Sequence, residues 1–223
     1  LAVIFDMKAA GIEYQQHRIG LLDVTGDIDV SNRSVRSLSL HSSNVISTGY
    51  RIDELSATVA GPLNKQQVEI FAKGADEITL VATGGMDRNN RWSGQIERLS
   101  LKPRDSQEWL LEKSSLLMVG QDEAYLEPLC LAAPENHICV KAAWQSQQGG
   151  TGQLQLDMAD FSMLTPYLPP GINVSSRING VINAKYALQS LTATGQFQAD
   201  SGTLVYQNND KRLEWPFSLE RIG

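Results

Sequence analysis

Apolar and polar residues alternate one by one along much of this sequence. In residues 22–30, for example, Val24, Ile28 and Val30 alternate with aspartates. Successive side chains of a β-strand point to opposite faces, so a period of two predicts a strand with one apolar and one hydrated face. The same alternation recurs over residues 35–40, 50–59, 67–71, 77–82, 92–101, 153–158, 177–188, 191–199 and 202–207. The chain is therefore predicted to be all-β.

Turn-forming residues separate the predicted strands. Clusters of Ser, Asn, Asp, Gly and Pro lie at residues 31–33, 61–64, 87–90 and 208–210. Small residues, often glycine, also recur beside the alternating positions at uneven spacings, which we interpret as a degenerate hairpin repeat. Such a repeat is typical of an open-ended stack, in which each strand has to match only its neighbours. We expect residues 1–223 to form one continuous internal segment of a longer protein.

A short helical turn is predicted near residues 160–168, where the alternation breaks. Asp160 can cap its start, and Phe161 and Leu164 share one helical face. Pro166 limits the element to one or two turns, of α or 3₁₀ type. We interpret it as a structural plug or corner.

The two cysteines, Cys130 and Cys139, flank a predicted turn that contains Pro134 and Asn136. We favour a disulfide, which would stabilise the fold by roughly 2.5–3 kcal/mol on a chain-entropy argument. A disulfide would indicate the periplasm or the cell exterior. Two buried free thiols are one alternative. Another is a zinc site with His137 as third ligand, although a second pair of ligands is missing.

No constellation of catalytic residues can be recognised in the sequence. His17, His41 and His137 are isolated from candidate nucleophiles, and G-x-S-x-G, H-E-x-x-H and phosphate-cradling glycine-rich motifs are missing. Asp27 and Asp29 share a strand face, but hydrated strand faces normally carry charges, so we assign no metal site there. We predict a protein without enzymatic activity, metal or cofactor.

The acidic composition restricts the partners. The net charge is −6 at pH 7, and no basic cluster is visible. A nucleic-acid partner requires a basic face, so neither DNA nor RNA is expected. Direct docking to an anionic membrane surface is disfavoured for the same reason. No apolar stretch approaches the roughly 20 residues that span a bilayer.

The predicted apolar faces are built mainly from Leu, Ile and Val, and aromatic residues make up only 7% of the chain. An aliphatic groove suits phospholipid acyl chains, because each CH₂ exposed to water costs about 0.8 kcal/mol. A bulge that shifts the pattern by one residue would invert a strand's faces. The residues expected to line this groove are Val24, Ile28, Val30, Leu38, Leu40, Ile52, Val59, Val68, Ile70, Ile78, Leu80, Ile96, Leu154, Leu156 and Val181.

A series of motifs follows one another within residues 79–183. They are, in order, Trp92-Ser93-Gly94, Trp109-Leu110-Leu111, Leu129-Cys130-Leu131 with Cys139, Phe161-Ser162-Met163-Leu164-Thr165-Pro166-Tyr167-Leu168-Pro169, and Gly180. With these motifs the stretch resembles the TamB family of AsmA-like bridge proteins. The order is specific because the paired cysteines precede an F-x-M-L-x-P-Y-L-P element. The flanking residues 1–78 and 184–223 match only as generic hairpin repeats.

The resemblance implies a periplasmic segment of a protein anchored in the bacterial inner membrane. The implied fold is an elongated β-taco, a bent, open, antiparallel-rich sheet with an apolar inner groove. The implied role is movement of phospholipid between the two membranes, linked to assembly of outer-membrane proteins and autotransporters. The implied partner is the outer-membrane assembly barrel TamA, through a region expected to lie outside this sequence. The family carries no catalytic residues.

Two other functions fit the same alternation. A chaperone-like scaffold would pair its strand edges with unfolded outer-membrane proteins. A closed structural β-sandwich would consume the apolar faces by packing them against each other.

Overall fold

A computed structural model of the chain describes residues 2–32, 34–47, 50–104, 106–158, 171–187, 190–208 and 211–222. All the regular elements in these ranges are β-strands, and the pairings between them are antiparallel, which confirms the all-β prediction. The predicted helical turn near residues 160–168 lies outside the described residues. The chain divides into two compact units, unit 1 (Leu1–Gln121) and unit 2 (Asp122–Gly223).

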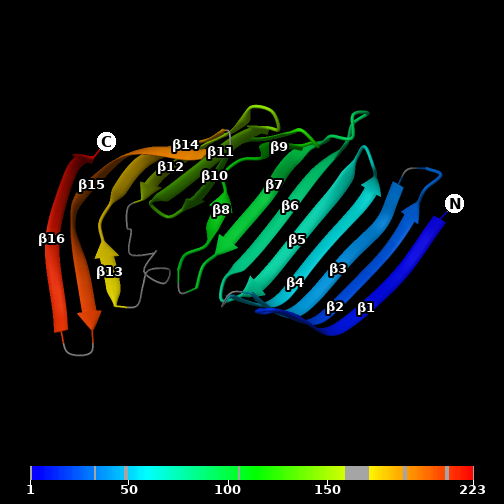
Figure 1. Ribbon diagram of the computed structural model, residues 1–223, viewed down its shortest axis with the longest axis horizontal. Coiled ribbons are helices and arrows are strands. Elements are labelled where there is room, and N and C mark those ends of the chain that lie inside the picture. Colours follow the sequence, from blue (N-terminus) through cyan, green and yellow to red (C-terminus); the bar gives the residue numbers. More distant parts are fainter. Residues whose placement is uncertain are drawn as a thin grey trace. The chain divides into compact units, whose positions relative to one another are not determined.

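Unit 1 is a meander in which strands that are consecutive in the chain are also neighbours in the sheet (Figure 1). The last two strands, β8 and β9, both pair with β7. The strands are β1 (Ala2–Tyr14), β2 (His17–Asp29), β3 (Ser34–Ser47), β4 (Tyr50–Pro62), β5 (Gln66–Gly74), β6 (Glu77–Met86), β7 (Trp92–Lys102), β8 (Trp109–Leu111) and β9 (Ser115–Val119).

Three turns of unit 1, those that follow β2, β4 and β6, lie where the polar clusters predict them. Between β6 and β7, Oδ1 of Asp87 accepts hydrogen bonds from the backbone N–H groups of Asn89 (2.7 Å) and Arg91 (3.0 Å). Asn90 adopts φ 56°, a left-handed conformation that asparagine tolerates well. The hydrogen bond from the backbone N–H of Arg91 is the main cause of the lowered pKa of the Asp87 carboxyl. One carboxylate thus closes the hairpin.

Unit 2 continues the antiparallel pattern with one irregular strand pair. β15 is long enough to pair with β14 along its first half and with β13 along its second half. β16 occupies the other edge of β15. The strands are β10 (Glu123–Ala133), β11 (Asn136–Gln145), β12 (Gly149–Met158), β13 (Ile172–Ser175), β14 (Ile178–Ala187), β15 (Ser190–Asn208) and β16 (Lys211–Ile222).

Hydrogen bonds bridge the break between β13 and β14. The backbone N–H of Asp200 donates to the carbonyl of Arg177 at 3.0 Å. The hydroxyl of the buried Ser176 donates to the carbonyl of Asp200 at 3.1 Å. The backbone of β15 therefore stays bonded where its partner strand changes.

β-bulges explain why the sequence alternation is imperfect. Between β6 and β7 the register shifts after Val81, so that Ala82 pairs with Ile96 while Leu80 pairs with Leu99. Ile96 and Leu99 thereby share a face, although they are an odd number of positions apart. Further register shifts lie in the pairings β2–β3, β3–β4, β4–β5, β10–β11 and β15–β16.

Candidate functional site

One face of the unit 1 sheet, the apolar face of unit 1, carries lines of hydrophobic side chains. Directly opposed residues of antiparallel strands point to the same side, so the register identifies the residues that share this face. One line crosses seven strands through Met7, Val24, Leu40, Ala57, Ile70, Leu80 and Leu99. A parallel line on one side of it contains Phe5, Gly26, Leu38, Val59, Val68, Ala82 and Ile96. A parallel line on the other side contains Ala9, Leu22, Ser42, Leu55, Ala72, Ile78 and Leu101.

The opposite face of unit 1 is predominantly polar. Lys8 pairs with Asp23 across β1 and β2, with 3.3 Å between Nζ and Oδ2. The hydroxyls of Thr25 and Ser39 are 2.6 Å apart and share a hydrogen bond. These cross-strand polar pairs lie in contact with water and contribute little net stability. The sheet thus has two chemically different sides.

Unit 2 repeats this two-sided design. Its apolar face, again assigned from the register, contains the lines Leu131, Ile138, Leu156, Gly180 and Phe197, then Leu129, Val140, Leu154, Ile182 and Gly195, and then Ala124, Trp144, Gly150, Tyr186 and Leu191. The other face of unit 2 is polar, with Gln153 donating from Nε2 to Oδ1 of Asn183 at 2.8 Å.

Among the residues that the structure describes, nothing seals the apolar faces within their own units. In both units all the described strands belong to a single sheet, which contradicts a two-sheet sandwich within either unit. Met7 remains 54% exposed and Leu191 70% exposed. Most of the remaining aliphatic side chains on these faces are half-buried. The hydrophobic residues that are almost fully buried in the described part of the chain are Ala82, Ile96, Trp109, Leu129, Cys130, Ala133 and Ala199.

Most of the residues predicted to line a groove lie on these two faces. On the apolar face of unit 1 they are Val24, Ile28, Leu38, Leu40, Val59, Val68, Ile70, Ile78, Leu80 and Ile96. On the apolar face of unit 2 they are Leu154 and Leu156. Their contact with lipid stays a prediction.

Three predicted residues lie elsewhere. Val30 follows the end of β2 and is 52% exposed in the turn. Ile52 lies at a register shift, where it faces Gly74 across the strand pair β4–β5. Val181 lies opposite Gln155 and Gln196 on the polar face of unit 2. Ile182, the next residue in the chain, lies on the apolar face instead.

The sequence alone does not identify every residue of the apolar faces. Val181 and Ile182 are both aliphatic, so alternation alone does not decide between them. Leu99 falls out of phase with Ile96 until the bulge is known. Phe5 and Phe197 each lie directly across from a glycine, and a side chain at that glycine would overlap the phenyl ring. The two glycines, Gly26 and Gly180, belong to the small residues that recur along the sequence.

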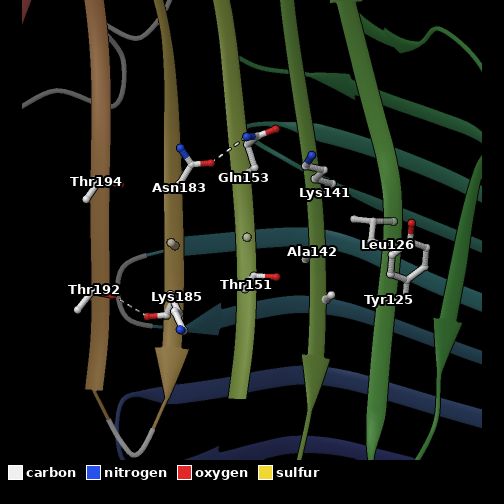
Figure 2. A pocket seen from close by; sticks show the side chains of 13 residues that line it. Tyr125, Leu126, Lys141, Ala142, Thr151, Gln153, Asn183, Lys185, Thr192 and Thr194 are labelled. Carbon is white, nitrogen blue, oxygen red and sulfur yellow. Dashed lines mark hydrogen bonds between the residues drawn. The ribbon is translucent and has the colours of Figure 1, made fainter. Parts of the chain in front are cut away.

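A hollow of about 560 Å³ lies in unit 2 (Figure 2). Residues of five neighbouring strands, β10, β11, β12, β14 and β15, contribute to its lining, among them Lys141, Gln153, Asn183, Lys185 and Thr192. None of the residues lining it is acidic. The hollow combines hydrogen-bonding groups and two lysine side chains with alanine, glycine and leucine residues in its lining.

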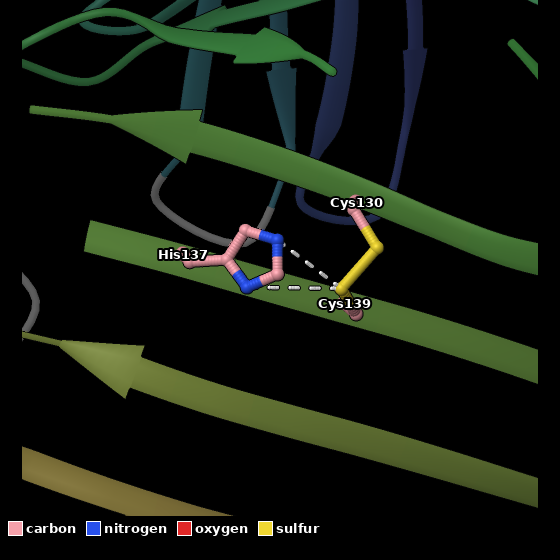
Figure 3. The surroundings of a disulfide bond; sticks show 3 residues. All are labelled: Cys130, His137 and Cys139. Atoms are coloured by element: carbon pink, nitrogen blue, oxygen red, sulfur yellow. Dashed lines mark hydrogen bonds between the residues drawn. A yellow bond between two sulfur atoms is a disulfide. The ribbon is translucent and has the colours of Figure 1, made fainter. Parts of the chain in front are cut away.

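The cysteines form a disulfide across the hairpin β10–β11, as favoured from the sequence. Cys130 and Cys139 are directly opposed, with Cα atoms 4.1 Å apart and sulfurs 2.12 Å apart. The imidazole of His137 lies beside this bond, with Nε2 3.5 Å from Sγ of Cys139 (Figure 3). Opposed side chains of one register position share a face, so the disulfide clips the two strands together on the polar face.

Comparison with known proteins yields one family match. The model of a family described as TamB, N-terminal domain, matches residues 2–222. The match includes the flanks, which resembled the family only as generic repeats. No solved structure matches the chain. In the described ranges, no helix has the length and apolarity needed to cross a membrane.

Proposed function

We propose, from the premise that this chain belongs to the TamB family, that its two apolar faces shield phospholipid acyl chains in transit between the inner and outer membranes. The family is a transport and assembly module, not a family of enzymes. The proposal places the chain in the periplasm of a bacterium, as part of a protein anchored in the inner membrane. Its partner would be TamA, and its transport role would serve outer-membrane protein assembly.

The observation that carries the proposal is the set of cross-strand lines of predominantly apolar side chains on these two faces. Met7, Leu40 and Ile70 belong to one line that crosses seven strands without a charged residue. A tail of about sixteen carbons crossing water would face a cost above roughly 10 kcal/mol at about 0.8 kcal/mol per CH₂. A continuous aliphatic surface removes part of this cost at every position along the line. It needs no directional bond, so a chain can slide.

The polar faces and the disulfide support the same setting. A sheet with one hydrated face can remain in an aqueous compartment while its other face holds lipid. Disulfides such as Cys130–Cys139 persist in oxidising compartments, of which the bacterial periplasm is one.

A matched pair of substitutions in β4 tests the proposal. Ala57 lies on the apolar face between Leu40 and Ile70, whereas Ser56 lies on the polar face opposite His41. Ala57→Asp places a carboxylate in the path of the acyl chain. The aspartate side chain is too short to extend to the hydrated face, so its charge would be desolvated by the lipid, which is costly. We expect the phospholipid that co-purifies with the chain, quantified by mass spectrometry, to fall severalfold.

Ser56→Asp serves as the control, because it adds the same charge one residue away on the hydrated face. We expect it to leave the bound lipid near the wild-type amount. Circular dichroism and urea unfolding establish that both variants fold. Equal lipid in Ala57→Asp and wild type would contradict the proposal. The chaperone-like alternative predicts instead that proline substitutions at strand edges impair function more than charges on the apolar face.

A further inference from the structure

We propose that the β10–β11 hairpin has two mutually exclusive states, which differ in the bonding of Cys130, His137 and Cys139. In the oxidised state the two sulfurs are joined to each other. In the reduced state they bind a thiophilic divalent cation, with zinc as the reference ion, together with the imidazole of His137. This inference is independent of lipid shielding, because the three residues lie on the polar face.

The register of the hairpin brings the three ligands together. Cys130 and Cys139 are directly opposed, and His137 precedes Cys139 by two residues on the same strand. Residues two apart on a strand point to the same side. The ligand atoms of the three residues consequently all lie within 4.8 Å of one another.

The distances suit tetrahedral zinc after a small movement. With Zn–S near 2.3 Å and Zn–N near 2.05 Å, sulfur and nitrogen ligands are separated by roughly 3.6 Å. Nε2 of His137 already lies 3.5 Å from Sγ of Cys139. Only the two sulfurs, which the disulfide joins, have to separate, to roughly 3.8 Å. Rotation about the Cα–Cβ bonds supplies that movement.

We expect the hairpin to keep its geometry without the disulfide. Leu129 pairs with Val140 and Leu131 with Ile138, on either side of the cysteines. The other edge of β11 is paired with β12 along its whole length. Because the backbone ladder fixes the Cα positions, we expect reduction to release the sulfurs from each other without dispersing them.

The chemistry of the exchange balances with a dithiol as reductant. The dithiol supplies two electrons and two protons, the bond between Cys130 and Cys139 breaks to give two thiols, and the dithiol becomes a cyclic disulfide. Zinc binding then releases two protons to water, since both sulfurs bind as thiolates and His137 binds as the neutral imidazole. The fourth position is left to water, as in other three-ligand sites.

The test uses the full 223-residue chain and zinc alone, with a chromophoric chelator as competitor. The chain treated with a dithiol, then freed of it under anaerobic conditions, is expected to bind one zinc ion. The oxidised chain is expected to bind none at this site. His137→Ala in the reduced chain is expected to weaken binding on the order of 100-fold or more, since losing even outer-shell partners costs roughly 10–100-fold. His41→Ala, on the polar face of unit 1, should have no effect.

A residue exchange separates a folded site from a flexible peptide that happens to contain the ligands. The variant Asn136→His/His137→Asn keeps the composition and moves the imidazole to the opposite face of β11. We expect it to bind as weakly as His137→Ala. Equal affinity in the exchange variant and wild type would show binding by an unfolded segment and overturn the proposal. So would zinc binding to the oxidised chain, or none to the reduced one.

Discussion

At the scale of single residues, Asp29 shows how the hairpins of unit 1 are fastened. It is 7% exposed and accepts hydrogen bonds from the amide side chain of Asn32 at 2.8 Å and from Arg36 at 3.0 Å. Arg36 also approaches Asp27 at 3.7 Å. The hydrogen bonds from Asn32, and then the charge of Arg36, lower the pKa of Asp29. The two aspartates thus have an internal counter-charge.

Asp29 therefore makes the stability of the fold depend on pH. A carboxyl whose folded pKa is lowered stabilises the fold above its unfolded pKa, near 4, and the contribution is lost as the pH falls through the folded value. We expect urea unfolding between pH 6 and pH 3 to show a smaller loss of unfolding free energy for Asp29→Asn than for wild type. Asp6→Asn, at an exposed site in β1, should follow wild type. Parallel curves for Asp29→Asn and wild type would refute this role.

At the scale of elements, alternation was enough to place most strands but not to orient every residue on them. The strands expected over residues 77–82 and 92–101 correspond to β6 and β7. The bulge between them depends on how two backbones pair, which one strand's pattern does not contain. The same holds for Val181, where two consecutive aliphatic residues leave the phase open until β12 and β14 pair.

Glycines opposite aromatic residues are a second device at this scale. Gly26 of β2 is opposed by Phe5 of β1, whose ring occupies the space of a Cβ atom. We expect Gly26→Val to destabilise the fold by about 1–3 kcal/mol, because the ring must be displaced. In Phe5→Ala/Gly26→Val the clash is gone, so the double variant should be more stable than the sum of the single effects predicts. Strict additivity in urea unfolding would argue against the contact.

At the scale of the whole molecule, both units repeat one plan, a hydrated face backed by an apolar one. The alternation of apolar and polar residues along the sequence predicts this plan. The division into Leu1–Gln121 and Asp122–Gly223 was not predicted from the sequence pattern. The prediction that residues 1–223 form one continuous segment stays a prediction.

If both apolar faces contact lipid, crosslinking should report it in both units. We expect a photoreactive amino acid at Val59 or Leu154 to crosslink to phospholipid. The same probe at Thr58 or Gln155, adjacent in the chain but on the polar faces, should give little product. Mass spectrometry of the adducts provides the measurement. Labelling restricted to one unit would limit lipid contact to that unit.

We expect the end of the chain to tolerate cleavage at the break between β13 and β14. β15 pairs with β14 through residues 190–199 and with β13 through residues 203–206, so both flanks of the break at Ser176 and Arg177 are bound to one continuous backbone. After a backbone cut at Arg177, the pairings β13–β15 and β12–β14 would both still join the two fragments. The nicked protein should therefore migrate as one species until it is denatured.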